Sequence, residues 1–345
     1  MMKKALSLLL LLALALGAVS CAPAQAPAAT PVPAAATPAD SAAPVETPAA
    51  EPTEAQAGPL RIAALKGPTG MGMVALMGEE YAKQYDITLA SAPDDVTASL
   101  ISGSLDIAAV PINLAAVLYN KLEGDVEMLA VNTLGVLYVL ENGDTVQSLQ
   151  DLSGKTLGAT GQGSTPEYIL NYLLEKNGLA DVQVEYYSEH SELATLLASG
   201  DVSLGMLPEP NVTAALAQNA GLRVALNLTE EWGKVSGTAL VQGCIIARKS
   251  AVEGKEAALA QFLTDYAAST AFVNGHHDKA SLLIEQYGVM AKAALAKKAI
   301  PNCNIVCLTG EEMRAAAGGM LQVLFAANPK SVGGAVPGDD FYYAG

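Results

Sequence analysis

The sequence predicts an α/β fold with two lobes that are joined by two crossing segments. Short runs rich in apolar and β-branched residues alternate with amphipathic helical patterns, which indicates sheets that are largely parallel. One order of strand, loop and helix occurs twice along the chain with matching glycine and proline residues. A stretch rich in Ala and Pro separates this part of the chain from its N-terminus. These three observations define the predicted architecture.

The first 20 residues have the pattern of a signal peptide. Lys3 and Lys4 precede an apolar run, residues 5–19, that is too short to span a bilayer comfortably. Small residues then precede Cys21, an arrangement that resembles a bacterial lipobox and implies attachment of a diacylglyceryl group to Cys21. We therefore expect a lipid-anchored protein at the outer face of the cytoplasmic membrane, in an extracellular or periplasmic setting.

Residues 21–59 predict a disordered tether that follows the lipidated cysteine. They are almost wholly Ala, Pro, Thr and Glu and include no aromatic residue. Such a stretch cannot bury enough apolar surface to offset the entropy lost on ordering. We expect the folded part to begin at Leu60.

The charge and cysteine content exclude several classes of protein. Without Lys3 and Lys4, 17 basic residues remain against 35 acidic ones, a net charge of −18. This balance argues against nucleic acid and against an anionic membrane surface as partners. The cysteines after Cys21 form a sparse, odd set that does not describe a disulfide framework: Cys244, Cys303 and Cys307.

The internal repeat predicts two similar lobes. Residues 102–111 read SGSLDIAAVP and residues 199–208 read SGDVSLGMLP, so Gly103 and Gly200 lie 97 positions apart (200 − 103). A helical pattern precedes each copy, at residues 94–101 and 191–198. Open α/β sheets bind ligands at the carboxyl ends of their strands. We therefore expect a ligand to be held between two such edges.

The crossings between the lobes fall in two β-rich runs, residues 131–141 and 237–247. Helical patterns at residues 256–272 and 311–326 then return the chain to the first lobe. The predicted first lobe comprises residues 60–140 and 236–345, and the predicted second lobe comprises residues 141–235. Two crossings predict a hinge.

Each predicted lobe has a glycine-rich loop between a strand and a helix. Backbone N–H groups are free at such a turn, and glycine lets a ligand approach the backbone closely. An ordinary strand-helix turn, capped by Ser164 or Thr165 in the second loop, is the alternative. The candidate ligand contacts are Lys66, Gly67, Thr69, Gly70 and Met71 in the first loop and Gly161, Gln162, Gly163, Ser164 and Thr165 in the second.

The ends of the repeated strands supply three further candidates: Pro111, Asn113 and Glu209. Prolines flank Glu209 on both sides and fix the backbone around it. This arrangement suits a carboxylate that is aimed at an amine or ring N–H of a ligand, although a solvated turn glutamate would have the same sequence.

Several of these motifs together resemble a known family. The Cys21 start, DLSGK at residues 151–155, SGD at 199–201 and MLPEP at 206–210 are similar to the substrate-binding proteins of nitrate, sulfonate, taurine and thiamine-precursor importers. The resemblance implies the type II periplasmic-binding-protein fold, a small-molecule ligand and an ABC permease as the membrane partner. Thiamine-type pyrimidines, other small heterocycles and small carboxylates or sulfonates all remain open as ligands. We also expect a monomer.

Two other functions are alternatives to a transport receptor. Pyrimidine synthases that share this fold bind pyridoxal phosphate and use a lysine, a histidine and a cysteine-rich patch. Here the histidines, His190, His276 and His277, lie outside the glycine loops, and no nucleophile, base and orienting residue converge. A ligand-sensing or adhesion lipoprotein is the other alternative. The sequence therefore predicts a binding protein with no catalytic activity, no cofactor and no metal site.

Overall fold

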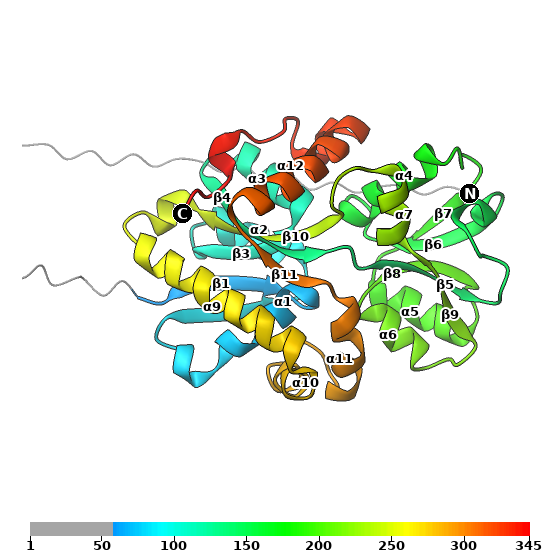
Figure 1. The fold of residues 1–345 in the computed structure, drawn as a ribbon, viewed down its shortest axis with the longest axis horizontal. Coiled ribbons are helices and arrows are strands. Elements are labelled where there is room, and N and C mark those ends of the chain that lie inside the picture. Colours follow the sequence, from blue (N-terminus) through cyan, green and yellow to red (C-terminus); the bar gives the residue numbers. More distant parts are fainter. Residues whose placement is uncertain (1–57) are drawn as a thin grey trace, which may run out of the picture. The chain divides into compact units, whose positions relative to one another are not determined.

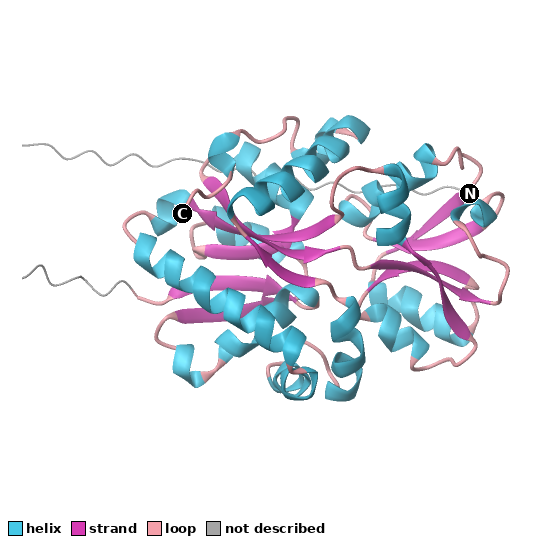
Figure 2. Ribbon diagram, in the orientation of Figure 1, coloured by secondary structure: helices cyan, strands magenta, loops and turns pink. Residues whose placement is uncertain are grey.

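The computed structural model describes residues 58–345. The predicted signal peptide, Cys21 and nearly all of the predicted tether lie outside the described residues. The described residues form two β-sheets, each with helices on both faces (Figures 1 and 2). Both sheets belong to one compact unit.

The first sheet has six strands in the order β11-β4-β10-β3-β1-β2. Its strands are β1 (Leu60–Leu65), β2 (Tyr85–Ala90), β3 (Ile107–Pro111), β4 (Val126–Leu134), β10 (Val241–Arg248) and β11 (Ile305–Leu308). Strand β1 pairs in parallel with both β2 and β3. Strands β3, β10, β4 and β11 pair antiparallel with one another in turn.

The second sheet has five strands in the order β7-β6-β8-β5-β9. They are β5 (Leu137–Asn142), β6 (Thr156–Thr160), β7 (Gln183–Tyr187), β8 (Leu204–Pro208) and β9 (Leu222–Asn227). Strand β6 is parallel to β7 and β8, whereas β5 is antiparallel to both β8 and β9. Each sheet is thus mixed rather than largely parallel. The chain leaves the first sheet through β4, enters the second through β5 and returns through β10, and these crossing strands make the antiparallel pairs.

The helices that precede the return crossing are α1 (Pro68–Gly72), α2 (Pro93–Ile101), α3 (Ile112–Lys121), α4 (Thr165–Lys176), α5 (His190–Ser199), α6 (Asn211–Leu216) and α7 (Leu228–Val235). Those that follow it are α8 (Lys249–Val252), α9 (Glu256–Gly275), α10 (His277–Gln286), α11 (Ala293–Ala299) and α12 (Gly310–Ala327). No helix of residues 58–345 is long and apolar enough to cross a membrane.

The predicted repeat is confirmed by the elements that surround it. Helices α2 and α5 occupy its two helical patterns, and β3 and β8 follow them. Helices α9 and α12 both pack on the first sheet, as expected for the C-terminal segments (Figure 1). Strand β5 pairs with β8 and β9, so the first crossing lies at residues 135–136, ahead of the boundary expected at 140. The return crossing lies between α7 and β10, at residues 236–240.

The segment after the first glycine loop differs from the helix expected to follow that loop. It forms α1 and two 3₁₀ turns, η1 (Val74–Met77) and η2 (Glu79–Tyr81). A Cβ atom on Gly72 would lie 2.7 Å from the Tyr266 hydroxyl oxygen, so α9 packs directly against backbone at this point. Gly78 then takes an extended conformation between the two turns and ends any helical continuation.

The hydrophobic core continues from one lobe into the other. Its largest cluster includes Val110 and Met128 of the first sheet and Leu157 and Met206 of the second. Trp232 is 1% exposed and belongs to the same cluster. Cys244, Cys303 and Cys307 are free thiols. His276 precedes α10 at an exposed junction with α9.

Candidate ligand-binding cleft

A cavity of about 410 Å³ lies where the carboxyl ends of strands from both sheets meet. Its walls include residues that follow or end β1, β3, β6 and β8, together with the first residues of several helices. This is the location at which open α/β sheets bind ligands. Its volume is within the range of small-molecule sites.

Nine of the thirteen ligand-contact residues that the sequence predicts line this cavity. They come from both glycine loops and both repeated strand ends: Lys66, Gly67, Thr69, Pro111, Gly161, Gln162, Ser164, Thr165 and Glu209. The two loops, separated by about 95 positions, therefore face a common space.

The other four predicted residues do not line the cavity. Met71 is 0% exposed and packs in the core, with its sulfur 3.8 Å from that of Cys303, against the expectation that it reaches the cleft. Gly70 is buried, and a Cβ atom there would lie 2.9 Å from the Leu65 carbonyl oxygen. Gly163 is exposed, and its N–H donates to Glu167 Oε2 at 2.6 Å. The N–H of Gly163 is therefore already occupied by a carboxylate of the chain.

Asn113 joins the two lobes behind the cavity wall. The hydroxyl of Thr165, at the start of α4, donates to Asn113 Oδ1, near the start of α3, over 2.8 Å. Thr165 is 0% exposed and Asn113 is 6% exposed. A second bond between the lobes runs from the Tyr138 hydroxyl of β5 to the Asn302 carbonyl oxygen at 3.3 Å. Asn113 therefore does not line the cavity itself, and its hydrogen bond to Thr165 helps to fix the position of α4.

Glu209 presents a buried carboxylate at the cavity. It is only 2% exposed and accepts hydrogen bonds from the Thr213 backbone N–H at 3.1 Å and the Thr213 hydroxyl at 2.9 Å. Burial raises the pKa of Glu209, although the bonds from Thr213 oppose that shift. Within residues 58–345 no basic side chain forms an ion pair with it. A ligand group that donates a hydrogen bond would complete its environment.

His190 is a cavity residue that the sequence reasoning placed outside the site. It begins α5, and its Nδ1 lies 2.7 Å from the Thr160 hydroxyl. Burial lowers the pKa of His190, so the neutral ring is favoured near neutral pH. Ser91 and Ser188 also line the cavity, 97 positions apart, at equivalent strand-helix turns. The 97-residue offset of the repeat also relates the turns at Ser91 and Ser188, so the repeat is the sequence signal for this second pair of turns.

The charged side chains that line the cavity are Lys66, Glu189 and Glu209. Lys66 forms no ion pair within the described residues and is free to meet an anionic group. With a neutral His190, the lining carries one formal positive charge and two negative ones. No group of His, Cys, Asp and Glu among residues 58–345 has the arrangement of a metal site. The geometry supports non-covalent binding of a polar molecule.

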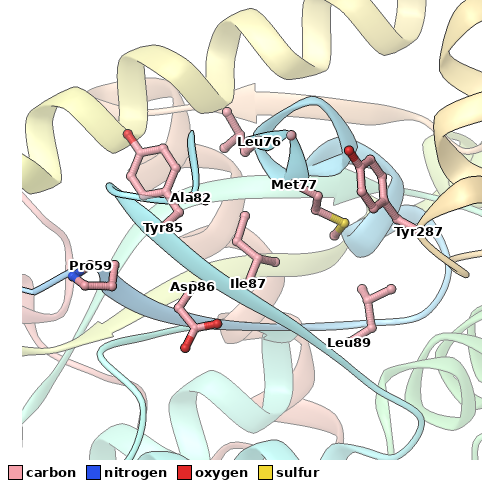
Figure 3. A pocket seen from close by; sticks show the side chains of 10 residues that line it. Pro59, Leu76, Met77, Ala82, Tyr85, Asp86, Ile87, Leu89 and Tyr287 are labelled. Atoms are coloured by element: carbon pink, nitrogen blue, oxygen red, sulfur yellow. The ribbon is translucent and has the colours of Figure 1, made fainter. Parts of the chain in front are cut away.

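A second cavity, of about 460 Å³, lies on the first lobe along the edge strand β2 (Figure 3). Met77 and Tyr287 lie toward one end of it, and Pro59 and Tyr85 toward the other. All its lining residues belong to the first lobe, and neither glycine loop contributes to it. The cavity between the lobes is therefore the candidate site.

Comparison with known proteins identifies the family. The family model described as "ABC transporter, phosphonate, periplasmic substrate-binding protein" matches residues 72–295, more than half of the chain. The chain belongs to this family of periplasmic substrate-binding proteins. Membership implies that the protein lies outside the cytoplasm and is the substrate-binding component of an ABC transporter. No curated protein matches the chain significantly.

Solved structures agree with this binding-protein fold. An ABC transporter protein from Parabacteroides distasonis has a TM-score of 0.71 and 24% identity, over 83% of this chain and 99% of its own. The periplasmic aliphatic sulphonate binding protein of Escherichia coli has a TM-score of 0.65 and 19% identity, over 83% and 96%. The alkanesulfonate-binding protein of Xanthomonas axonopodis bound to MOPS has a TM-score of 0.61 and 16% identity, over 79% and 93%. At these identities the likeness concerns the fold.

Proposed function

We propose that this binding protein captures a small organic molecule between its two lobes and delivers it to an ABC permease. The observation that carries the proposal is a cavity that equivalent strand-helix turns of both lobes line together. The nine lining residues from the loops and strand ends are the proposed contacts. A ligand held there would touch both lobes and would thereby favour their closed arrangement.

Two ligand classes fit the proposal: a thiamine-type pyrimidine and a small anion. The family description names phosphonate, and two of the similar structures are named for sulfonates. Lys66 would pair with an anionic group, whereas Glu209 would accept from an amine or ring N–H. Anchoring through Cys21 at the outer face of the membrane, as a monomer, would keep the receptor beside its permease.

Native mass spectrometry of the full chain in mild detergent tests this function. The protein is titrated with methylphosphonate, ethanesulfonate, nitrate and the aminopyrimidine moiety of thiamine, and is also measured as purified. We expect one molecule bound per chain and a smaller radius of gyration in small-angle scattering upon binding. An unchanged scattering profile at saturation would indicate a rigid binding module, and absence of any bound molecule would refute the proposal.

A further inference from the structure

Two irregularities in the β4–β10 ladder lie beside the cleft. The pairing skips Gln242 on β10 and Asn132 on β4, so each is the extra residue of a bulge. Bulges redirect side chains and are common next to binding sites. Both residues lie in the strands through which the chain passes between the lobes. The irregular pairing therefore brings two amide side chains to the crossing.

The polar atoms of this region lack hydrogen-bond partners. Gln242 Nε2, Thr133 Oγ1 and both side-chain polar atoms of Asn132 are buried and unpartnered. Gln242 is 9% exposed, Thr133 is 3% exposed and Asn132 is 0% exposed. An unsatisfied buried polar group costs about 1–3 kcal/mol, and such groups are rare in native proteins. Their concentration at one place calls for a partner.

That place is the floor of the cavity between the lobes. Thr133, Gln242 and Gly243 line it directly. Asn132 lies immediately behind Gly243, because a Cβ atom on Gly243 would be 2.7 Å from Asn132 Oδ1. The same Cβ atom would be 3.4 Å from Cγ2 of Thr69, which also lines the cavity. Asn132 Oδ1 thus occupies the space that a side chain at position 243 would need, and the amide packs against the Gly243 backbone that lines the cavity.

We propose that Thr133 and Gln242, backed by Asn132 directly behind Gly243, form a polar floor that hydrogen-bonds the ligand. This proposal rests on the proposed function and specifies the class of ligand that the cavity binds. The Thr133 hydroxyl can accept as well as donate a hydrogen bond, and Gln242 Nε2 offers a donor. Their complement is a planar edge with an acceptor beside an N–H group, as in a carboxamide or a nitrogen heterocycle.

The charge of the cavity agrees with that ligand class. One lysine and two glutamates line it, and Glu167 already occupies the Gly163 N–H. A fully ionised phosphonate would meet two carboxylates with a single cation to offset them. An uncharged or zwitterionic molecule would satisfy the floor amides and give Glu209 an N–H donor without that repulsion.

The test compares variants that remove the floor's polar atoms and keep its shape: Gln242→Met, Thr133→Val and Asn132→Leu. The matched control is Thr229→Val. Its hydroxyl is also buried and unpartnered, but it packs against Gly135 and does not line the cavity. Each full-length protein is incubated with protein-free yeast extract, and the bound molecule is identified and quantified by native mass spectrometry beside a thermal melt.

We expect the wild type and Thr229→Val to hold the same molecule, which carries an acceptor beside an N–H donor. Each floor variant should bind it about 5- to 150-fold more weakly, with an equal or higher melting temperature because an unsatisfied polar group is gone. Undiminished binding by all three variants would refute the proposed floor and would indicate that ordered water, not the ligand, hydrogen-bonds these polar atoms. So would a bound oxyanion without a donor, or an affinity loss matched by lower melting temperatures. A wild type that binds nothing would overturn the proposed function, and the floor with it.

Discussion

The hydrogen bond between Thr165 and Asn113 is expected to hold the two lobes together. Thr165→Val removes the donor and preserves the shape of the side chain. Asn113 Oδ1, in a residue only 6% exposed, would then lack the partner that lies 2.8 Å away in the wild type. Leaving a buried acceptor unsatisfied costs about 1–3 kcal/mol. Separation of the lobes removes that cost, because water can then reach Asn113.

The expected consequence is a shift of the open-to-closed ratio by about 5- to 150-fold toward the open form. Small-angle scattering of the unliganded full chain should show a larger radius of gyration for Thr165→Val. Thr165→Ser keeps the hydroxyl and should restore the wild-type value. Thr195→Val is the matched control, because the Thr195 hydroxyl bonds only to Ser191 on the exposed side of its own helix.

Calorimetric titration gives the second measurement of the same effect. The apparent affinity should fall by up to the factor by which the closed population falls, because the proposed site is complete only when both lobes contribute. A Thr165→Val protein with the scattering profile and the affinity of Thr195→Val would refute the reasoning. The hydrogen bond would then form without affecting the ratio of the open to the closed form.

Four further outcomes are expected. Burial raises the pKa of Glu209, so the stability of the wild type should fall as the pH rises from about 4.5 through that raised pKa. Glu209→Gln should therefore have a higher melting temperature than the wild type at neutral pH but not in acid. An equal difference in melting temperature at every pH would contradict this. Lys66→Ala should weaken an anionic ligand by about 1.5–3 kcal/mol in calorimetry and leave an uncharged one unaffected. Gly163→Val should reduce ligand binding, because φ at this position is +74° and valine would distort the loop. Gly70→Val should chiefly lower the melting temperature, because its side chain would meet the Leu65 carbonyl oxygen. The reverse pattern would place the second loop outside the site. Cys21→Ser should abolish incorporation of a radiolabelled fatty acid, and unchanged labelling would contradict lipidation at this cysteine.

Local patterns were sufficient to predict most elements of each lobe. Helices α2 and α5 begin one residue before the predicted positions. These elements depend on nearby residues: the spacing of apolar side chains and the glycines and prolines at their ends. The repeat added a non-local prediction, because two similar units place equivalent loops at equivalent sheet edges. The repeat therefore predicts that loops about 95 positions apart face one cleft.

The sequence by itself determined the alternation of strands and helices, the two-lobed plan and the loops that meet in the cavity. Only the tertiary structure decided which side chains reach that cavity. Met71 and Gln162 lie in equally plausible glycine loops, yet Met71 is buried in a core cluster with Cys303, while Gln162 lines the cleft. The floor at Asn132 and Gln242 arises from bulges in strand pairing, and no local pattern specifies them. Pairing register and burial depend on which distant segments pack together, and that packing exists only in the folded chain.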